Sequence, residues 1–436
     1  MPLKPPLKNV LYDWNPWWTN KDKIKNLTGK KREDYINMLT SLIKRKEILC
    51  LTGVRRCGKT TVMYQLIEHL LNTYEQTDIV YINFDDERLV PLLKDGTILE
   101  DMYKTYIEAT GKTKPLFVFF DEIQNIKGWE KWMKRYYDTK NIKFIVTGSS
   151  STLSQPELSA LLTGRNISIK ISPLSFKEFL EFRNIKTPNL SKMDFEQAYY
   201  SLKDKEGVYI HHFEDYLEIG GFPEAVLEKD EQRRKILLQQ YFKDILFRDI
   251  IARYPVKNEE LLEKLVTYLM ENISNLLSHR RISNATGTTV DTVKRYLNYV
   301  EKSLLISKIT AFTYSTTEQL IGVKPVKIYA ADTGMRNQVS MRFSKDTGRL
   351  AENAAFIHLL SHYDRIHYWR NKGEVDFVVD NKICVQVCYG EKPDREIKNL
   401  REFNNRFSKI ILTRDEFKEG KIPMIPLWLF CLRPQI

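Results

Sequence analysis

The feature that most constrains the fold is a glycine-rich segment, GVRRCGKTT, at residues 53–61. A short apolar run, EILCLT, precedes it, and an apolar-periodic run, TVMYQLIEHLL, follows it. A loop of the pattern GxxxxGK[ST] between a strand and a helix is typical of phosphate binding. Its small residues let backbone N–H groups surround phosphate oxygens, and the helix that follows directs its positive end at the anion. The segment therefore predicts a P-loop within an α/β fold.

Each position of this loop is a candidate contact for a nucleotide. Lys59 is expected to reach the β and γ phosphates, where it would serve both binding and catalysis, and the hydroxyl of Thr60 is expected to bind Mg²⁺. Arg55 and Arg56 fit contact with phosphates or a partner subunit and fit plain solvated charge equally well. The predicted cofactors are ATP and Mg²⁺. The predicted binding residues are Gly53, Val54, Arg55, Arg56, Cys57, Gly58, Lys59, Thr60 and Thr61.

A second motif, LFVFFDE at residues 116–122, places two acids directly after a run of apolar residues. Asp121 is predicted to hold the Mg²⁺ shell together with Thr60, and Glu122 is predicted to polarise the attacking water as general base. The alternative is a strand that simply ends in polar residues. Adjacent acids after five apolar residues are hard to explain as a solvated face, so the functional interpretation is favoured.

Three further residues are candidates near the phosphates. The run FIVTGSSS ends in hydroxyls, so Ser149 or Thr147 would sense the γ-phosphate or place the water, unless these hydroxyls cap a helix instead. Arg165 stands just before the last predicted strand. It is a candidate to stabilise transition-state charge in cis or in trans, and a surface salt bridge is the alternative.

The pattern of apolar runs gives the domain organisation. Strands alternate with helices from Glu47 onward, which predicts a doubly wound α/β domain with a parallel sheet. We expect Trp14, Trp17 and Trp18 to anchor the preceding arm onto this domain rather than to stack on a ligand. The predicted order is an N-terminal arm (1–46), a P-loop ATPase domain (47–174), a helical lid or linker (175–255), a winged helix (256–345) and a small C-terminal α/β domain (346–436).

A helix-turn-helix pattern lies at residues 282–302, with its turn at Gly287 and with Thr288 or Thr289 as the helix cap. Strands on either side of residues 313–323 would form the wing. Outward residues of the second helix could touch phosphates and base edges of DNA, unless the fold serves as a packing or protein-contact module. These outward residues are Thr292, Lys294, Arg295 and Asn298.

The C-terminal residues have the layout of a metal-dependent nuclease. Glu352 lies on a predicted helix and Asp376 on a strand, but Gln386 and Cys388 stand where an acid and a lysine are needed. A thiol supplies no positive charge, and Lys392 has no geometric reason to replace it. A structural, catalytically inactive domain is therefore expected.

A second candidate in this region is a pair of histidines four residues apart, His358 and His362. They should share a helix face. No acid completes an HExxH motif and no third ligand is apparent, so a surface or core pair is favoured over a zinc site.

Charge and composition limit the class of protein. Lys plus Arg number 68 and Asp plus Glu number 56, which gives a net charge of +12 and favours a polyanionic partner. The five cysteines are too scattered for a disulfide framework, and the apolar runs are shorter than the ~20 residues of a membrane-spanning helix. We expect a cytoplasmic protein with no membrane association, whose partner is DNA, a protein or a second copy of the chain.

Several motifs together resemble a known family. They are strung in order along almost the whole chain: GVRRCGKTT, FFDEIQNIKGWE, IVTGSSS, LTGR followed by PLSFKEFL, GGFPEAV and GEVDFVV. In these motifs the chain resembles predicted archaeal and bacterial ATPases of the AAA-like class. Such proteins join a P-loop domain to a helical segment, a winged helix and a restriction-endonuclease-like domain.

The resemblance implies ATP binding and hydrolysis, and a sheet with an extra strand between the strand before the P-loop and the strand before Asp121. The family commonly keeps Glu and Lys at the positions of Gln386 and Cys388, which argues against nuclease activity here. We therefore expect a Mg²⁺-dependent ATPase or ATP-driven switch acting on DNA or protein. The alternatives are an ATP-gated nuclease and a non-hydrolysing ATP-binding module for signalling or assembly.

Overall fold

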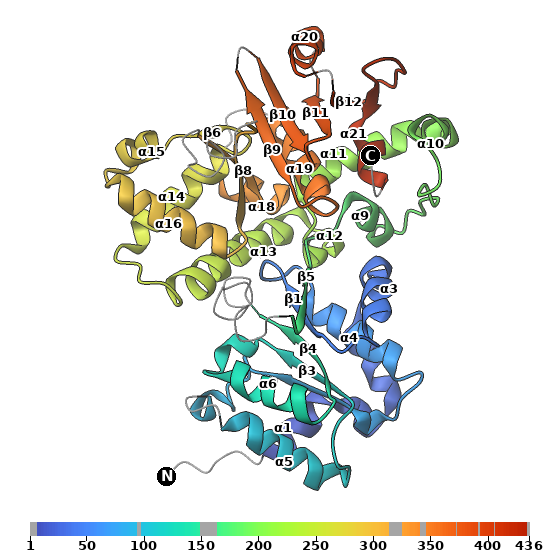
Figure 1. Cartoon of the computed structure of the whole chain (residues 1–436), viewed down its shortest axis with the longest axis vertical. Coiled ribbons are helices and arrows are strands. Elements are labelled where there is room, and N and C mark those ends of the chain that lie inside the picture. Colours follow the sequence, from blue (N-terminus) through green and yellow to red (C-terminus); the bar gives the residue numbers. More distant parts are fainter. Residues whose placement is uncertain are drawn as a thin grey trace. The chain divides into compact units, whose positions relative to one another are not determined.

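The computed structural model describes residues 7–93, 97–148, 164–313, 325–340, 346–371, 373–390, 393–404 and 406–433. The chain divides into two compact units, Met1–Ile171 and Ser172–Ile436. Figure 1 shows both units, with the first coloured from blue to green and the second from green to red. Each unit has its own sheets and helices.

The first unit is built on a five-stranded parallel sheet in the order β2-β3-β4-β1-β5. Its strands are β1 (Ile48–Thr52), β2 (Ile79–Asn83), β3 (Phe117–Asp121), β4 (Lys143–Thr147) and β5 (Asn166–Lys170). The four strands β1 to β4 are almost wholly buried, as continuous apolar runs require. Strand β4 lies between β1 and β3, which confirms the predicted extra strand.

Helices cover both faces of this sheet. Tyr64, on α4 (Lys59–Leu70), packs against Tyr81 of β2, with ring centroids 4.7 Å apart. Trp132, on α6 (Trp129–Thr139), packs against Phe120 of β3 at 6.1 Å. Tyr81 is paired with Phe119, and neighbouring residues of a strand point to opposite faces. The helices α4 and α6 therefore lie on opposite sides of the sheet (Figure 1). Helix α5 (Ile98–Thr110) packs beside α6.

The N-terminal arm is folded against the edge strand β2. Its elements are α1 (Leu7–Trp14), η1 (Pro16–Trp18), η2 (Lys21–Ile24), α2 (Lys25–Thr28) and α3 (Glu33–Leu42). The Asn15 amide donates to Tyr81 O at 2.8 Å, and its oxygen accepts from Tyr81 N at 2.7 Å. The indoles of Trp17 and Trp18 donate to Ile79 O. The arm thus satisfies the exposed edge of the sheet, and the prediction that the tryptophans anchor it is confirmed.

The second unit begins with helices that surround a double-glycine turn. They are α9 (Phe176–Phe182), α10 (Phe195–Leu202), α11 (Glu206–Ile219), α12 (Pro223–Leu227), α13 (Glu231–Asp244) and the π-helix η7 (Ile245–Ile251). In the turn, Gly221 N donates to Asp332 Oδ2 at 2.6 Å. A Cβ on Gly220, which has a φ of +78°, would lie 2.3 Å from Asp332 Oδ1. The glycines of GGFPEAV therefore admit a buried carboxylate that also caps α18 (Thr333–Val339).

A small helix-and-strand region follows. It contains α14 (Glu259–Glu271), β6 (Leu276–Leu277), α15 (His279–Thr286), α16 (Val290–Lys302), β7 (Ile306–Ile309) and β8 (Val326–Ala330). The strands form an antiparallel sheet in the order β6-β8-β7. The predicted helix-turn-helix is present, with Gly287 in the left-handed region and the hydroxyl of Thr289 accepting from Thr292 N. Its assignment as a winged helix stays a prediction.

The C-terminal part is a mixed sheet in the order β13-β12-β11-β10-β9. Its elements are α19 (Thr347–Leu360), β9 (Ile366–Arg370), β10 (Glu374–Val379), β11 (Ile383–Cys388), α20 (Asp394–Glu402), β12 (Ser408–Thr413), β13 (Met424–Pro426) and α21 (Leu427–Leu432). Strands β9, β10 and β11 pair antiparallel, whereas β11, β12 and β13 pair parallel. The predicted separate α/β region is confirmed, and its nuclease-like character stays a prediction.

Candidate nucleotide-binding site

The P-loop joins β1 to α4 and depends on its glycines for shape. Gly53 has a φ of +157°, and a Cβ there would lie 2.1 Å from Ile171 O. Gly58 has a φ of +99° and stands directly before the first residue of α4. The sulfur of Cys57 donates to Ile171 O at 3.1 Å. The loop therefore packs against the end of β5, where a larger residue at position 53 has no room.

Lys59 lies inside the loop rather than in solvent. Its side chain is buried, and Nζ donates to the carbonyl oxygens of Gly53 and Val54, each at 3.1 Å. An ammonium group held by backbone carbonyls at the start of a helix is suited to an incoming polyphosphate. This placement agrees with the role predicted for Lys59.

Asp121 is the last residue of β3, and its carboxylate accepts hydrogen bonds from three hydroxyl groups. Its Oδ2 accepts from Thr60 Oγ1 at 2.6 Å and from Tyr81 OH at 2.8 Å. Its Oδ1 accepts from Thr147 Oγ1. Burial raises the pKa of Asp121, the charge of Glu122 raises it further, and the hydroxyl donors oppose both. The structure thus brings together the two predicted Mg²⁺ ligands, Thr60 and Asp121.

Glu122 follows in a strained turn. Its φ of +54° lies in the left-handed region, which residues other than glycine adopt uncommonly. Glu122 N donates to Thr147 Oγ1 at 3.0 Å, and the Gln124 amide donates to Glu122 Oε2. This turn directs the chain away from the sheet immediately after Asp121. Thr147 links the two acids through these hydrogen bonds, and its predicted role toward the γ-phosphate or the water stays a prediction. Ser149 lies outside the described residues.

Arg165 does not lie near the phosphate loop. It stands at the start of β5, and Ile48, the first residue of β1, donates to its carbonyl. The P-loop follows the other end of β1, which is about 13 Å away along a five-residue strand. The side chain points to Asp138, with Nε 3.4 Å from Oδ1. The predicted role in cis is therefore wrong on geometric grounds, and a role in trans stays a prediction.

Three residues that support the site were not predicted. Tyr81 donates to Asp121 from β2, Arg32 donates to the carbonyl of Cys57 at 3.0 Å, and Gln65 binds the arm at the carbonyls of Thr28 and Lys30. Arg32 and Gln65 are both buried. Gln65 carried a usable signal, because it is the one polar residue within the run VMYQLI of an otherwise apolar helix.

The predicted DNA-facing helix has the expected orientation. On α16, Val293, Leu297 and Val300 are buried, whereas Lys294 and Arg295 are exposed. Asn298 is exposed too. The geometry agrees with the predicted outward set and does not test DNA binding.

The predicted nuclease-like residues converge, but around a lysine. Asp376 Oδ2 accepts from the Gln386 amide at 2.8 Å, and Glu352 and Asp376 each lie within 3.2 Å of Lys327 Nζ. Cys388 is buried at the end of β11, and Lys392 lies outside the described residues. The two acids are therefore neighbours, and their cation is a side chain that the sequence did not suggest.

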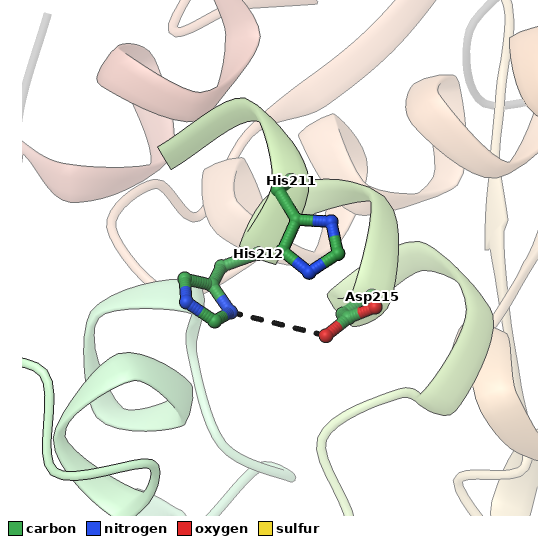
Figure 2. A group of neighbouring side chains, drawn as sticks. All are labelled: His211, His212 and Asp215. Carbon is green, nitrogen blue, oxygen red and sulfur yellow. Dashed lines mark ion pairs between the residues drawn. The ribbon is translucent and has the colours of Figure 1, made fainter. Parts of the chain in front are cut away.

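Histidines form two small clusters in the second unit. His358 and His362 share a face of α19, with ring centroids 4.7 Å apart. Within the described part of the chain, one group of three potential metal ligands has its ligand atoms within 4.8 Å of one another: His211, His212 and Asp215 on α11. Figure 2 shows His212 directed at Asp215, with Nδ1 and Oδ2 separated by 3.8 Å.

In this second cluster, a neighbouring arginine partly balances the negative charge of Asp215. The guanidinium of Arg183 lies 3.9 Å from the same oxygen of Asp215. Burial lowers the pKa of His212, and the charge of Asp215 opposes that shift. We therefore describe His211, His212 and Asp215 as an ion-pair cluster.

The sheet order, the P-loop after β1 and the acid pair at the end of β3 define an AAA-type P-loop ATPase fold. Residues 45–180 match the family described as AAA domain, and residues 210–346 match a domain of unknown function, DUF8612. The chain is 33% identical to the uncharacterized protein MJ1544 of Methanocaldococcus jannaschii, over 94% of either chain. The chain therefore belongs to the same family as that archaeal protein.

Bacterial and structural relatives are more distant. An uncharacterized protein of Haemophilus influenzae is 27% identical over 90% of this chain and 95% of its own length. Among solved structures, the Walker-type ATPase PABY2304 of Pyrococcus abyssi is 15% identical, with a TM-score of 0.43 over 71% of this chain and 95% of that one. AMPPCP-bound DnaA from Aquifex aeolicus is 16% identical, with a TM-score of 0.28 over 69% of this chain and 93% of that one.

Among the helices that the structure describes, none has the length and apolar character needed to cross a membrane.

Proposed function

We propose that the chain binds ATP with Mg²⁺ at the P-loop and hydrolyses it, as an ATPase or an ATP-driven switch. The observation that carries this proposal is the 2.6 Å hydrogen bond between Thr60 Oγ1 and Asp121 Oδ2, directly beside the buried Lys59. A P-loop hydroxyl and an acid at the end of β3 form the pair of oxygen ligands that a P-loop ATPase needs.

The donor set fits Mg²⁺. A hydroxyl and a carboxylate oxygen are hard ligands, and Mg²⁺ in phosphate-transfer sites is bound by one or two such groups together with substrate phosphates. Bound there, the ion would neutralise charge that develops on the phosphate oxygens. The hydroxyls of Tyr81 and Thr147 would keep the carboxylate of Asp121 oriented for that ligand.

The remaining side chains have separate tasks in the proposed reaction. Lys59 would transfer its hydrogen bonds from the loop carbonyls to the β and γ phosphates. Glu122 would accept the proton of the attacking water, and Gln124 would hold its carboxylate by the hydrogen bond to Oε2. The left-handed turn at Glu122 supports this role, because it separates the direction of Glu122 from that of the metal ligand Asp121.

The test is Glu122→Gln, which keeps the shape of the side chain and removes its basic oxygen. We expect ATP to bind as in the parent and turnover to fall by about 10²- to 10⁴-fold, the usual contribution of a general base. Turnover is measured by phosphate release and binding by calorimetry. Glu87→Gln, an exposed acid of the same unit, is the matched control and should change neither quantity.

Three outcomes would contradict the proposal. Unchanged turnover in Glu122→Gln would mean that another group acts as base. Parent protein that binds no Mg²⁺-ATP would rule out a nucleotide site, and Lys59→Ala that binds it as well as the parent does would place that site elsewhere.

For the partner, we propose DNA contacted by the exposed face of α16, within a winged helix formed by α14 to α16 and β6 to β8. The support is the exposure of Lys294 and Arg295 above a fully buried inner face. Nucleotide state would then change how this part is presented to DNA. A protein partner or a second copy of the chain is the alternative, to be distinguished by the salt dependence described below.

A further inference from the structure

One buried lysine in the second unit contacts three carboxylates. Lys327 Nζ lies 2.6 Å from Glu374 Oε1, 3.1 Å from Asp376 Oδ1 and 3.2 Å from Glu352 Oε1. Its side chain is 2% exposed. The lysine comes from β8, whereas the acids come from β10 and α19. Three elements of the unit therefore converge on one ammonium group.

Further protein groups donate to the carboxylates of this cluster. Asp376 Oδ2 accepts from the Gln386 amide at 2.8 Å and from Val387 N at 3.0 Å. Tyr329 OH donates to Glu352 Oε1 at 2.7 Å. Protein donors therefore contact Glu352 Oε1 and both carboxylate oxygens of Asp376.

The charge of Lys327 is secured by its surroundings. Burial disfavours the ammonium form, but the carboxylates of Asp376, Glu352 and Glu374 outweigh it and raise the pKa of Lys327 above its usual range. A divalent cation would have to approach to 2.0–2.6 Å of the same oxygens, about where a positive charge already stands. The metal that a nuclease-like domain implies therefore does not fit this set of residues.

We propose that Lys327 is a built-in replacement for a metal ion. Its ammonium group occupies the point where Glu352, Glu374 and Asp376 converge, so the cluster takes no divalent cation and instead fixes β8 to α19 and β10. The inference is independent of ATP binding by the first unit.

The proposal has a sharp consequence, because removal of Lys327 should turn the cluster into a metal site. Lys327→Met retains an unbranched side chain as far as Cε, removes Nζ and leaves three carboxyl groups around a neutral side chain. Glu374, whose side chain is 36% exposed, also lines a cavity of about 320 Å³ together with Ser278, Arg281 and Arg370, so this acid of the cluster is open to solvent. Oxygen ligands of this kind suit Mn²⁺.

The experiment measures Mn²⁺ binding to the nucleotide-free full chain by electron paramagnetic resonance. All proteins carry Asp121→Asn, which removes the proposed Mg²⁺ ligand of the first unit. We expect Lys327→Met to bind one additional Mn²⁺ at least about tenfold more tightly than the parent, because one close positive charge is gone. Adding Asp376→Asn should abolish this binding. Lys308→Met, at a partly exposed lysine that pairs with Glu301, is the matched control and should bind no additional ion.

Three results would overturn the proposal. The first is that the parent already binds Mn²⁺ and loses this binding when Asp376→Asn is introduced. The second is that Lys327→Met folds but binds no additional Mn²⁺. The third is that the additional binding of Lys327→Met persists when Asp376→Asn is added. If Lys327→Met does not fold, the double variant Lys327→Met with Glu374→Gln reduces the uncompensated charge by one. That variant should bind Mn²⁺ through Glu352 and Asp376, and a folded double variant that binds none would count against the proposal equally.

Discussion

Asp121 and Asp376 are both buried aspartates on strands, but their partners differ in kind. Asp121 accepts hydrogen bonds from the neutral hydroxyls of Thr60, Tyr81 and Thr147. Asp376 meets the ammonium of Lys327 as well as neutral donors. The first carboxylate is oriented without being neutralised, whereas the second is neutralised within the protein.

The two sites therefore differ in charge balance: the protein supplies a cation beside Asp376 but none beside Asp121 among the contacts described above. Hydroxyl groups orient an anion but leave its charge uncompensated, so burial raises the pKa of Asp121 and favours the arrival of a cation. A buried ion pair with supporting hydrogen bonds has no such demand. The same residue type on the same kind of element is therefore suited to receiving a cation in one unit and to holding elements together in the other.

The largest effect we expect is on the stability of the completed site. Lys327→Met leaves buried carboxylates without their cation, and breaking a buried pair in this way costs about 3–5 kcal/mol. Urea unfolding of the metal-free chain measures this cost, and hydrogen exchange in β8 and β10 reports the unfolding of this part of the protein. The control is Lys308→Met, whose partly exposed pair with Glu301 should contribute about 1 kcal/mol or less. An equal loss of unfolding free energy in the two variants would mean that the buried cluster of Lys327 is no more important for stability than a surface ion pair.

A smaller effect should appear in the pH dependence of the first unit. The pKa of Asp121 is raised above 3.8, so the folded state holds this proton more tightly than the unfolded state does. The contribution of Asp121 to the unfolding free energy, measured as the difference between the nucleotide-free parent and Asp121→Asn, should therefore increase as pH falls from 7 toward 4, by about 1.4 kcal/mol per unit of pKa difference.

The measurement is urea unfolding at several pH values, with hydrogen exchange in β3 to report on the first unit. Asp138→Asn, at an exposed position, is the control and should keep the parent's profile. A parent whose stability instead declines over this range, by an amount that Asp121→Asn abolishes, would mean that the hydroxyls outweigh burial.

The smallest effect concerns the exposed basic face of α16 in the second unit. If α16 binds DNA phosphates, Lys294→Ala with Arg295→Ala should lower the slope of log affinity against log salt by about 0.9 for each phosphate that is no longer neutralised. Fluorescence anisotropy with a duplex at several salt concentrations measures the slope. Lys264→Ala, an exposed lysine on α14, should leave it unchanged. Parent protein that does not bind DNA at low salt would favour a protein-contact module.

The features that could be predicted from the sequence are those whose parts lie close together in the chain. The P-loop and the acid pair are contiguous motifs, and the buried runs around them indicated the strands and the sheet. Helix α16 followed from apolar periodicity and a threonine cap, both local signals. Ser149 and Lys392 lie outside the described residues, so their predicted roles stay predictions.

What could not be predicted depends on contacts between distant segments. Lys327 stands 49 residues before Asp376, in a strand that reads as an ordinary wing. Arg32 lies in a lysine-rich stretch whose lysines are exposed or partly exposed, so the sequence gave no sign that this one basic residue is buried. The error at Arg165 arose because a residue just before a parallel strand lies at the edge of the sheet opposite the phosphate loop.

The side chain of Asn15 has a consequence for how this protein can be divided. Its two hydrogen bonds to Tyr81 take the place of a neighbouring strand, and Tyr81 in turn holds Asp121. A fragment that began at residue 45, where the match to the AAA domain starts, would lose this amide along with Arg32. Such a fragment would present a bare strand edge to other copies and would lack the support of Arg32 for its P-loop, so any self-association or weak ATP binding would reflect the truncation rather than the intact protein.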